Sequence, residues 1–170
     1  MGCDIRLFIE VKRKESKHWF NFGSEFRLTR NYWMFGTLCK GVRCEPEQSF
    51  EERGLPKDYG YVVGEKMFLY VSENDDEGNV KPDKANKWIE NGSSWALKND
   101  DGTITHVSDP DLHSYSWLTG LEYEQALEWF DVQAKIDGNS IPIDYLAIRS
   151  AMKDYESRDY ETRVVFAFDN

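Results

Sequence analysis

Charged side chains near the two ends of the chain are the first candidates for a functional site. Asp4 and Arg6 near the start alternate with apolar residues, as do Arg163 and Asp169 near the end. Alternation with a period of two is typical of β-strands. If the two strands are neighbours, we expect these four charges to share one face of a sheet and to bind an anionic or polar ligand. The alternative is a solvated face of cross-strand ion pairs, which stabilise a fold weakly.

A long irregular segment, residues 42–64, supplies a second candidate set. It contains Arg43, Arg53 and Lys57 among several glycines and prolines. The guanidinium group of arginine forms a planar fork that suits phosphate or carboxylate. Loops of this length within a domain are often functional. We therefore expect Arg43 and Arg53 to contact a ligand.

Residues 106–113 carry two histidines and two aspartates, a set that can ligate a metal. Pro110 makes this segment a turn, and the spacing matches no recognised metal signature, so we predict no metal. His113, Ser114 and Trp117 instead offer hydrogen bonds and a stacking ring for a ligand. The chain has no phosphate-binding glycine loop, nucleophile elbow or paired-cysteine zinc motif. We accordingly assign no cofactor and no catalytic residue.

The formal net charge of −10 limits the partners. It argues against binding to duplex nucleic acid, because neutralising phosphates requires clustered Lys and Arg. An acidic surface can bind a basic protein surface, or can serve only to keep the chain in solution. The six Trp, nine Tyr and ten Phe include more rings than a core needs, and surface rings are good anchors for planar ligands.

Cysteine usage and hydropathy indicate the compartment. Three cysteines, an odd and small number, favour a reducing environment over a disulfide scaffold. The sequence shows no signal peptide and no apolar run of membrane-spanning length. We expect a cytoplasmic protein with no membrane partner.

Helices and strands must position these residues, and their predicted order indicates an α+β fold in one domain, residues 1–170. Both terminal segments, 3–11 and 163–169, are expected to be strands of a mixed or antiparallel sheet with one buried face. Two longer helices are predicted over 120–135 and 142–156, and short helices near 32–40 and 84–90. Strands that cluster before the long helices favour α+β over regular βαβ alternation.

An ordered set of short motifs resembles a family of small phage and prophage proteins of unknown function. The set opens with Met1-Gly2-Cys3-Asp4-Ile5 and ends with Val165-Phe166-Ala167-Phe168-Asp169-Asn170. Between these lie Arg30-Asn31-Tyr32, Gly41-Val42-Arg43, Arg53-Gly54-Leu55-Pro56 and His113-Ser114-Tyr115-Ser116-Trp117-Leu118. The family's usual opening has His where this chain has Arg6, which removes any imidazole role there but retains anion binding. The resemblance implies a non-virion role in the host cytoplasm, of the kind that counters bacterial defence.

Three functions are compatible with these residues. The first is binding of a nucleotide-like small molecule, such as a host immune signal that is sequestered, with no chemistry performed. The second is inhibition of a host defence protein through the acidic segments 45–52 and 73–77. The third is hydrolysis of a nucleotide signal by His113 with Asp4 or Asp169. We rank them in this order, and leave the oligomeric state open between a monomer and a homo-oligomer.

Overall fold

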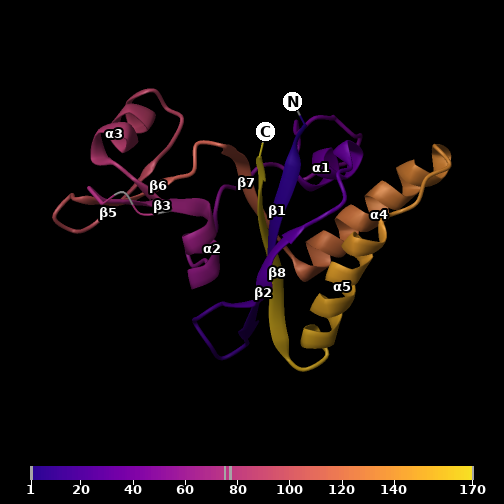
Figure 1. Cartoon of the computed structure of the whole chain (residues 1–170). Helices are drawn as coiled ribbons and strands as arrows, with labels where there is room; N and C mark the ends of the chain where they lie inside the picture. Colours follow the sequence, from indigo (N-terminus) through magenta and orange to yellow (C-terminus); the bar gives the residue numbers. More distant parts are fainter. Residues whose placement is uncertain (1, 75, 77, 170) are drawn as a thin grey trace.

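The two ends of the chain form the central strands of an antiparallel sheet. The structure, a computed structural model, describes residues 2–74, 76 and 78–169. Strand β1 (Asp4–Arg13) pairs along its whole length with β8 (Tyr160–Asp169). Strands β2 (Phe20–Arg27) and β7 (Leu112–Thr119) flank them, so that sheet A has the order β2-β1-β8-β7 (Figure 1). The prediction that both termini belong to the sheet is confirmed.

Three helices cover one face of sheet A. They are α1 (Tyr32–Leu38), α4 (Gly120–Ile136) and α5 (Ile143–Glu156), close to the predicted ranges. The apolar stripe of β1 and the buried side chains of β8 pack beneath them. Thr119 and Glu122 form a reciprocal capping box that fixes the start of α4. Within the described residues, no helix combines the length and apolar character needed to cross a membrane.

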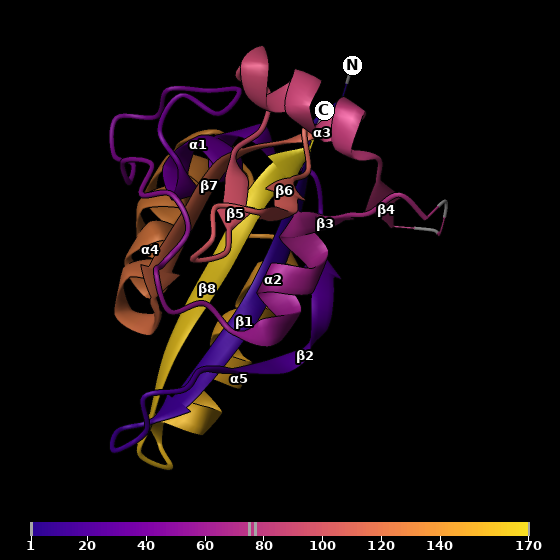
Figure 2. The same cartoon turned by 90° about the vertical axis from the view of Figure 1, so that its left-hand side faces the viewer.

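The opposite face of sheet A is also buried, which the sequence did not predict. Phe8, Val165 and Ala167 have no exposure to solvent and pack against Val63 and Met67 of α2 (Tyr61–Met67). Figure 2 shows α2 and a second sheet lying over β1 and β8. The expectation of one buried face was therefore wrong, because charged residues of the second face are paired in the interior rather than solvated.

The second sheet, sheet B, is mixed and smaller. Its order is β4 (Asn79–Val80), β3 (Phe68–Val71), β6 (Ile104–Ser108) and β5 (Ala96–Lys98), with β3 and β4 parallel. Helix α3 (Pro82–Glu90) packs beside it. Proline at the first helical position starts this helix two residues before the predicted one. Five helices and two four-stranded sheets in the described residues make an α+β fold, as predicted.

The long segment between α1 and β3 is tied to the rest of the fold. Backbone hydrogen bonds join it to α1, from Lys40 N to Phe50 O at 2.8 Å and from Phe50 N to Thr37 O at 3.1 Å. Its last residues are not irregular as predicted, because α2 begins at Tyr61. This anchoring brings residues 50–58 over the edge of sheet A.

Candidate functional site

A buried ion pair links the two central strands. Glu10 of β1 lies opposite Arg163 of β8, and Arg163 Nε donates to Glu10 Oε2 at 2.7 Å. Glu10 has no solvent exposure, and Arg163 is 4% exposed. The backbone N–H of Gly60, just before α2, also donates to Glu10. Charges are rarely buried unless they are paired in this way.

Arg163 also holds the long loop in place. Its Nη1 donates to Asp58 Oδ1 at 2.7 Å, and its Nη2 donates to the Asp58 carbonyl at 3.0 Å. The indole Nε1 of Trp19 donates to the other carboxylate oxygen of Asp58 at 3.0 Å. One guanidinium therefore joins β1, β8, the β1–β2 turn and the loop before α2.

Rings and cations alternate as far as Phe50 in a row that we call the ladder, which ends in a pair of stacked rings. Its members, in spatial order, are Lys12, Trp19, Arg163, Trp117, Arg53, Phe50 and Trp129. Arg163 Cζ lies 3.9 Å from the ring centre of Trp19 and 5.9 Å from that of Trp117. Arg53 Cζ lies 5.2 Å from the centre of Trp117 and 5.5 Å from that of Phe50. These distances are within the range of cation–π attraction.

The second arginine of the ladder is held by a bidentate ion pair. Arg53 Nη1 and Nη2 donate to the two carboxylate oxygens of Glu122 at 2.9 and 2.7 Å. Its side chain is 29% exposed. Because Glu122 belongs to the capping box of α4, the same carboxylate fixes both the helix start and the loop arginine.

A pocket of about 720 Å³ opens beside the ladder. We call it the ladder pocket, and its lining residues are Lys14, Trp19, Pro56, Lys57, Asp58, Trp117, Thr119, Gly120, Leu121, Glu156, Tyr160, Glu161, Thr162 and Arg163. These residues come from the β1–β2 turn, the long loop, the end of β7, the start of α4, the end of α5 and β8. These lining residues are far apart in the sequence, and only the fold brings their side chains together around one pocket.

The carboxylates in and behind this pocket differ in their titration. Burial raises the pKa of the Glu10 carboxyl, although Arg163 opposes this. Partial burial alone would raise the pKa of Asp58, but hydrogen bonds from Arg163 and Trp19 outweigh it and lower that pKa below its usual value. Glu156 accepts two hydrogen bonds from Arg149 at 2.9 Å and a third from Thr162. All three carboxylates are therefore engaged within the protein.

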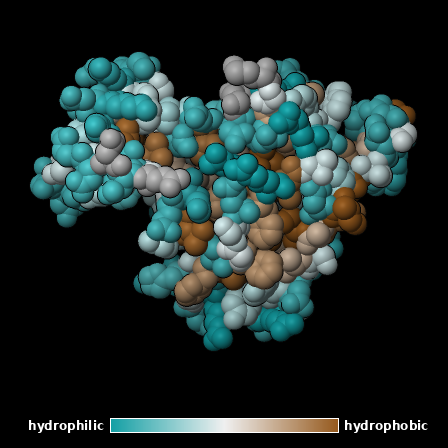
Figure 3. All heavy atoms as spheres, viewed as in Figure 1, coloured by the Kyte–Doolittle hydropathy of each residue, from teal (hydrophilic) through white to brown (hydrophobic). Residues whose placement is uncertain are grey.

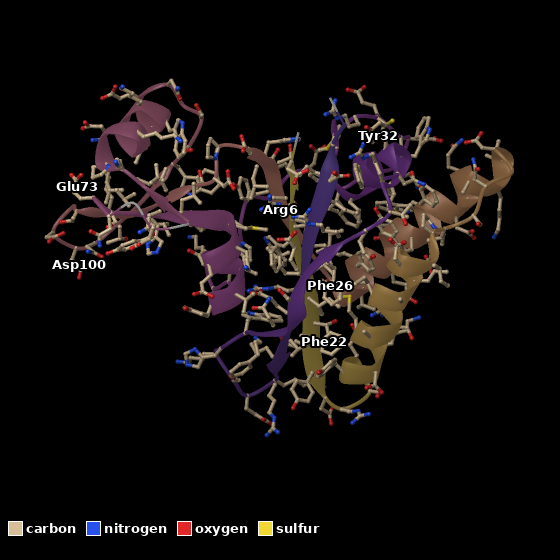
Figure 4. All side chains as sticks on the ribbon, viewed as in Figure 1. Arg6, Phe22, Phe26, Tyr32, Glu73 and Asp100 are labelled. Carbon is tan, nitrogen blue, oxygen red and sulfur yellow. The ribbon has the colours of Figure 1, made fainter. Side chains whose placement is uncertain are left out.

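The four charges predicted to share a sheet face do so, but they form two separate groups. Asp4, Arg6 and Asp169 lie at the end of the sheet near the termini, where Arg6 Nε donates to Asp169 Oδ2 at 3.3 Å. Arg30 forms a bidentate ion pair with Asp4. Figure 4 labels Arg6 on this part of β1. Arg163 is six residues away along β8, so only Arg163 contributes to the ladder pocket.

Of the other predicted residues, Trp117 lines the ladder pocket, whereas Arg43, Arg53, His113 and Ser114 do not. His113 Nδ1 is 3.1 Å from Ser114 Oγ, and its ring stacks on Phe168 with centres 6.1 Å apart. Among the described residues, His113 Nε2 is buried without a hydrogen-bond partner, and no ion pair joins His113 to Asp4 or Asp169. Arg43 Cζ lies 5.8 Å from the ring centre of Tyr32. Of the nine predicted residues, Arg53, Trp117 and Arg163 are the ones that the ladder brings together.

Sequence reasoning did not select Glu10, Trp19 or Asp58 for the site. One feature of the sequence could have identified Glu10. It lies between apolar neighbours in a strand, and a carboxylate at such a position needs a cation opposite it. Trp19 and Asp58 lie in connecting segments, and no pattern in the sequence relates them to Arg163.

A metal site does not emerge in the part of the chain that the structure describes, where no three His, Cys, Asp or Glu side chains are placed to share an ion. Compared with protein-family models, with curated proteins and with solved structures, the chain gives no match. The resemblance to a phage family therefore stays a prediction, and the site is interpreted from its geometry alone.

The surface divides into a polar and an apolar region. Hydrophobic residues gather over β2 and the adjoining part of α5, where Phe22 and Phe26 lie, whereas polar residues cover sheet B and α3 (Figure 3 and Figure 4). Glu73 and Asp100 project on the side of the molecule away from α4 and α5 (Figure 4). Of the acidic segment 73–77, Asp75 and Glu77 lie outside the described residues.

Proposed function

We propose that this protein binds a nucleotide-like small molecule in the ladder pocket and releases it unchanged. The observation that carries the proposal is the wall of Trp19, Arg163 and Trp117 beside a pocket of about 720 Å³. Small-molecule sites commonly enclose about 300–1,000 Å³. Indole rings favour planar bases, because every base has a face that can stack on an aromatic ring.

The charges around the pocket favour a ligand with few negative charges. Three cations, Lys14, Lys57 and Arg163, face three carboxylates, Asp58, Glu156 and Glu161. Within the described residues Lys57 has no ion-pair partner, so its ammonium group is available for a phosphate. The carboxylates can accept hydrogen bonds from base amino groups or ribose hydroxyls. This balance suits a monophosphate or a cyclic nucleotide better than a polyphosphate.

The lining supports binding rather than cleavage. The described lining residues include no His or Cys, and Asp58 and Glu156 already accept hydrogen bonds from arginine. A carboxylate that is held by a cation is a weaker proton acceptor than a free one, although it can still accept hydrogen bonds from a ligand. The resemblance to phage proteins adds a context, in which the bound molecule is a signal of the host's defence and binding removes it from solution.

Calorimetric titration with cyclic nucleotides, nucleoside monophosphates and ADP-ribose derivatives tests the proposal. We expect at least one to bind, and Trp117→Ala to weaken that binding by at least about fivefold, since stacking contributes about 1–3 kcal/mol per base. Trp33→Ala is the matched control, because Trp33 is 46% exposed on α1 and does not line the pocket. Ligand recovered intact after denaturation supports sequestration. Failure of every ligand to bind, or equal binding by Trp117→Ala, contradicts the proposal.

A second candidate function is inhibition of a host defence protein, and it rests on the exposed acidic segment 45–52. Glu45, Glu47, Glu51 and Glu52 are all exposed there, and Glu51 pairs with Lys40 at 2.6 Å. Such a segment suits a basic surface on a partner protein. Replacing the four glutamates with lysine is expected to abolish capture of that partner from host lysate. Unchanged capture would exclude this surface as the binding site.

A further inference from the structure

A second pocket, separate in its main walls from the ladder pocket, is built from four aromatic rings. It has a volume of about 410 Å³ and lies between sheet A, sheet B and the long loop. Its rings are those of Tyr59, Phe68, Trp95 and Tyr115. They come from the loop before α2, from β3, from the residue before β5 and from β7. We call this pocket the aromatic cage.

The rings stand as walls rather than as one stack. The planes of Phe68 and Trp95 cross at 87°, with centres 5.8 Å apart, and those of Trp95 and Tyr115 cross at 76°, with centres 4.6 Å apart. Tyr59 lies nearly parallel to Phe68, at 23° and 6.0 Å. The four rings line one hollow, and the face of an aromatic ring carries negative potential that attracts a cation placed over it.

The walls are fixed before any ligand arrives. The phenolic O–H of Tyr115 donates to the Asp109 carbonyl at 3.3 Å. The backbone of Trp95 forms two hydrogen bonds with Ser108. The Trp95 N–H donates to Ser108 Oγ at 3.0 Å, and the Ser108 N–H donates to the Trp95 carbonyl at 2.9 Å. Phe68 and Tyr115 are buried, whereas Trp95 remains 41% exposed at the opening. An exposed indole on a rigid backbone is a ring face that a ligand can cover without reordering the protein.

Two charged side chains, Glu52 and Lys57, line the cage. Glu52 lines the cage, is exposed, and has no ion-pair partner in the described part of the chain. The net charge of −10 adds an attractive field for cations. Lys57 also lines the cage and opposes this attraction, although it lines the ladder pocket as well. From the rings and Glu52 together, we propose that the aromatic cage binds a small organic cation of the quaternary ammonium class.

Titration calorimetry with choline, compared with its uncharged isostere 3,3-dimethylbutan-1-ol, tests the proposal. The two molecules have the same shape, so only the charge separates them. Choline is expected to bind at least about tenfold more tightly, which corresponds to about 1.4 kcal/mol of cation–π attraction. Absence of choline binding, or equal affinity for the two molecules, would overturn the proposal.

Variants locate the binding. Trp95→Ala is expected to weaken choline binding at least about tenfold, while Trp33→Ala leaves it unchanged. Glu52→Gln, a nearly isosteric change at an exposed position, is expected to leave the fold intact and to weaken the binding of choline but not of the isostere. Lys57→Gln should strengthen choline binding. Unchanged choline affinity in a folded Trp95→Ala variant would contradict binding in the aromatic cage. If that variant does not fold, unchanged choline affinity in Glu52→Gln would contradict it instead.

The cage and the ladder pocket can be tested independently. Trp117 lines the ladder pocket and not the cage. Choline binding is therefore expected to survive Trp117→Ala, the variant that weakens nucleotide binding under the proposed function. Loss of choline binding in a folded Trp117→Ala variant would assign both ligands to one pocket and overturn a separate cage.

Discussion

Arg163 connects strand pairing to the candidate site. Its guanidinium reaches Glu10, Asp58 and the ring of Trp19 from a position that is 4% exposed. Removing water from two charges is costly, and their attraction offsets that cost only when geometry and further hydrogen bonds are good. Gly60 supplies one such bond to Glu10, which has no exposure to solvent. The pair is therefore a means of fixing the loop and Trp19 more than a source of stability.

Glu122 provides a residue-scale test through pH. The hydrogen bond from Arg53 is the main cause that lowers the pKa of Glu122 below 4.5. A carboxyl whose pKa is lower in the folded state stabilises the fold above its unfolded pKa, and loses that effect as pH falls through the folded value. Glu122→Gln keeps the capping-box geometry but removes the charge. We expect it to lower the free energy of unfolding by about 1 kcal/mol near neutral pH.

That difference should shrink as the pH falls below 4.5, because the wild-type carboxyl then becomes protonated in both states. Urea unfolding of both proteins across this pH range measures it. Glu128→Gln, on an exposed position of the same helix, is the control and should show no such pH dependence. A difference that stays constant with pH would contradict an ion-pair origin.

At the scale of elements, the packing of the long loop on α1 depends on a close approach of the loop backbone to Gly36. A Cβ added to Gly36, in the middle of α1, would lie 2.5 Å from the Cys44 carbonyl oxygen and 2.8 Å from Pro46 Cδ. Glycine weakens a helix interior by about 1 kcal/mol relative to alanine. The chain accepts that weakening because the loop backbone packs directly on the helix. The loop then continues to Pro56 and Lys57, which line both pockets.

Gly36→Ala is therefore expected to destabilise the protein by about 1–3 kcal/mol, despite the higher helix propensity of alanine, because the backbone must move. Denaturant unfolding measures the change. Gly64→Ala in α2 is the matched control, since its Cβ would approach only the Tyr59 ring, at 3.2 Å. Its effect should be smaller. If Gly36→Ala were neutral or stabilising, the loop would not be held by this contact.

At the scale of the whole molecule, the stability should be unevenly distributed. Strands β1 and β8 have a neighbour on each side and are buried on both faces, whereas sheet B has short strands and a small core of its own. Local opening is easiest where few apolar contacts are lost. The aromatic cage lies where these two parts meet, whereas no lining residue of the ladder pocket belongs to sheet B. Motion of sheet B would therefore alter the aromatic cage before it altered the ladder.

Native-state hydrogen exchange tests this distribution. Amides of β1 and β8 are expected to exchange at least about a hundredfold more slowly than those of β5 and β6, because they require global rather than local unfolding. Mass spectrometry of peptides from the four strands measures the rates. Equal protection in the two sheets would show that they open as one cooperative unit.

The sequence predicted the α+β class, both terminal strands and the two long helices, because each depends on local periodicity. It also placed Arg53, Trp117 and Arg163 among the candidates, although for separate reasons. The helix at Tyr61–Met67 was missed, since its single glycine, Gly64, resembles the glycines of the loop before it. The second buried face of sheet A was missed because it carries charged residues. Charged residues indicate a solvent-exposed face unless their ion-pair partners are known.

What the sequence determined by itself is which residues of β1 and β8 share a face, because strand alternation is a property of the backbone. It therefore put Asp4, Arg6, Arg163 and Asp169 together on the face away from the apolar stripe. Only the tertiary structure decided that Arg163 faces Glu10 and a loop aspartate, while Arg6 and Asp169 form another group at the end of the sheet. Register and loop packing set those partners, and both depend on contacts between residues far apart in the chain.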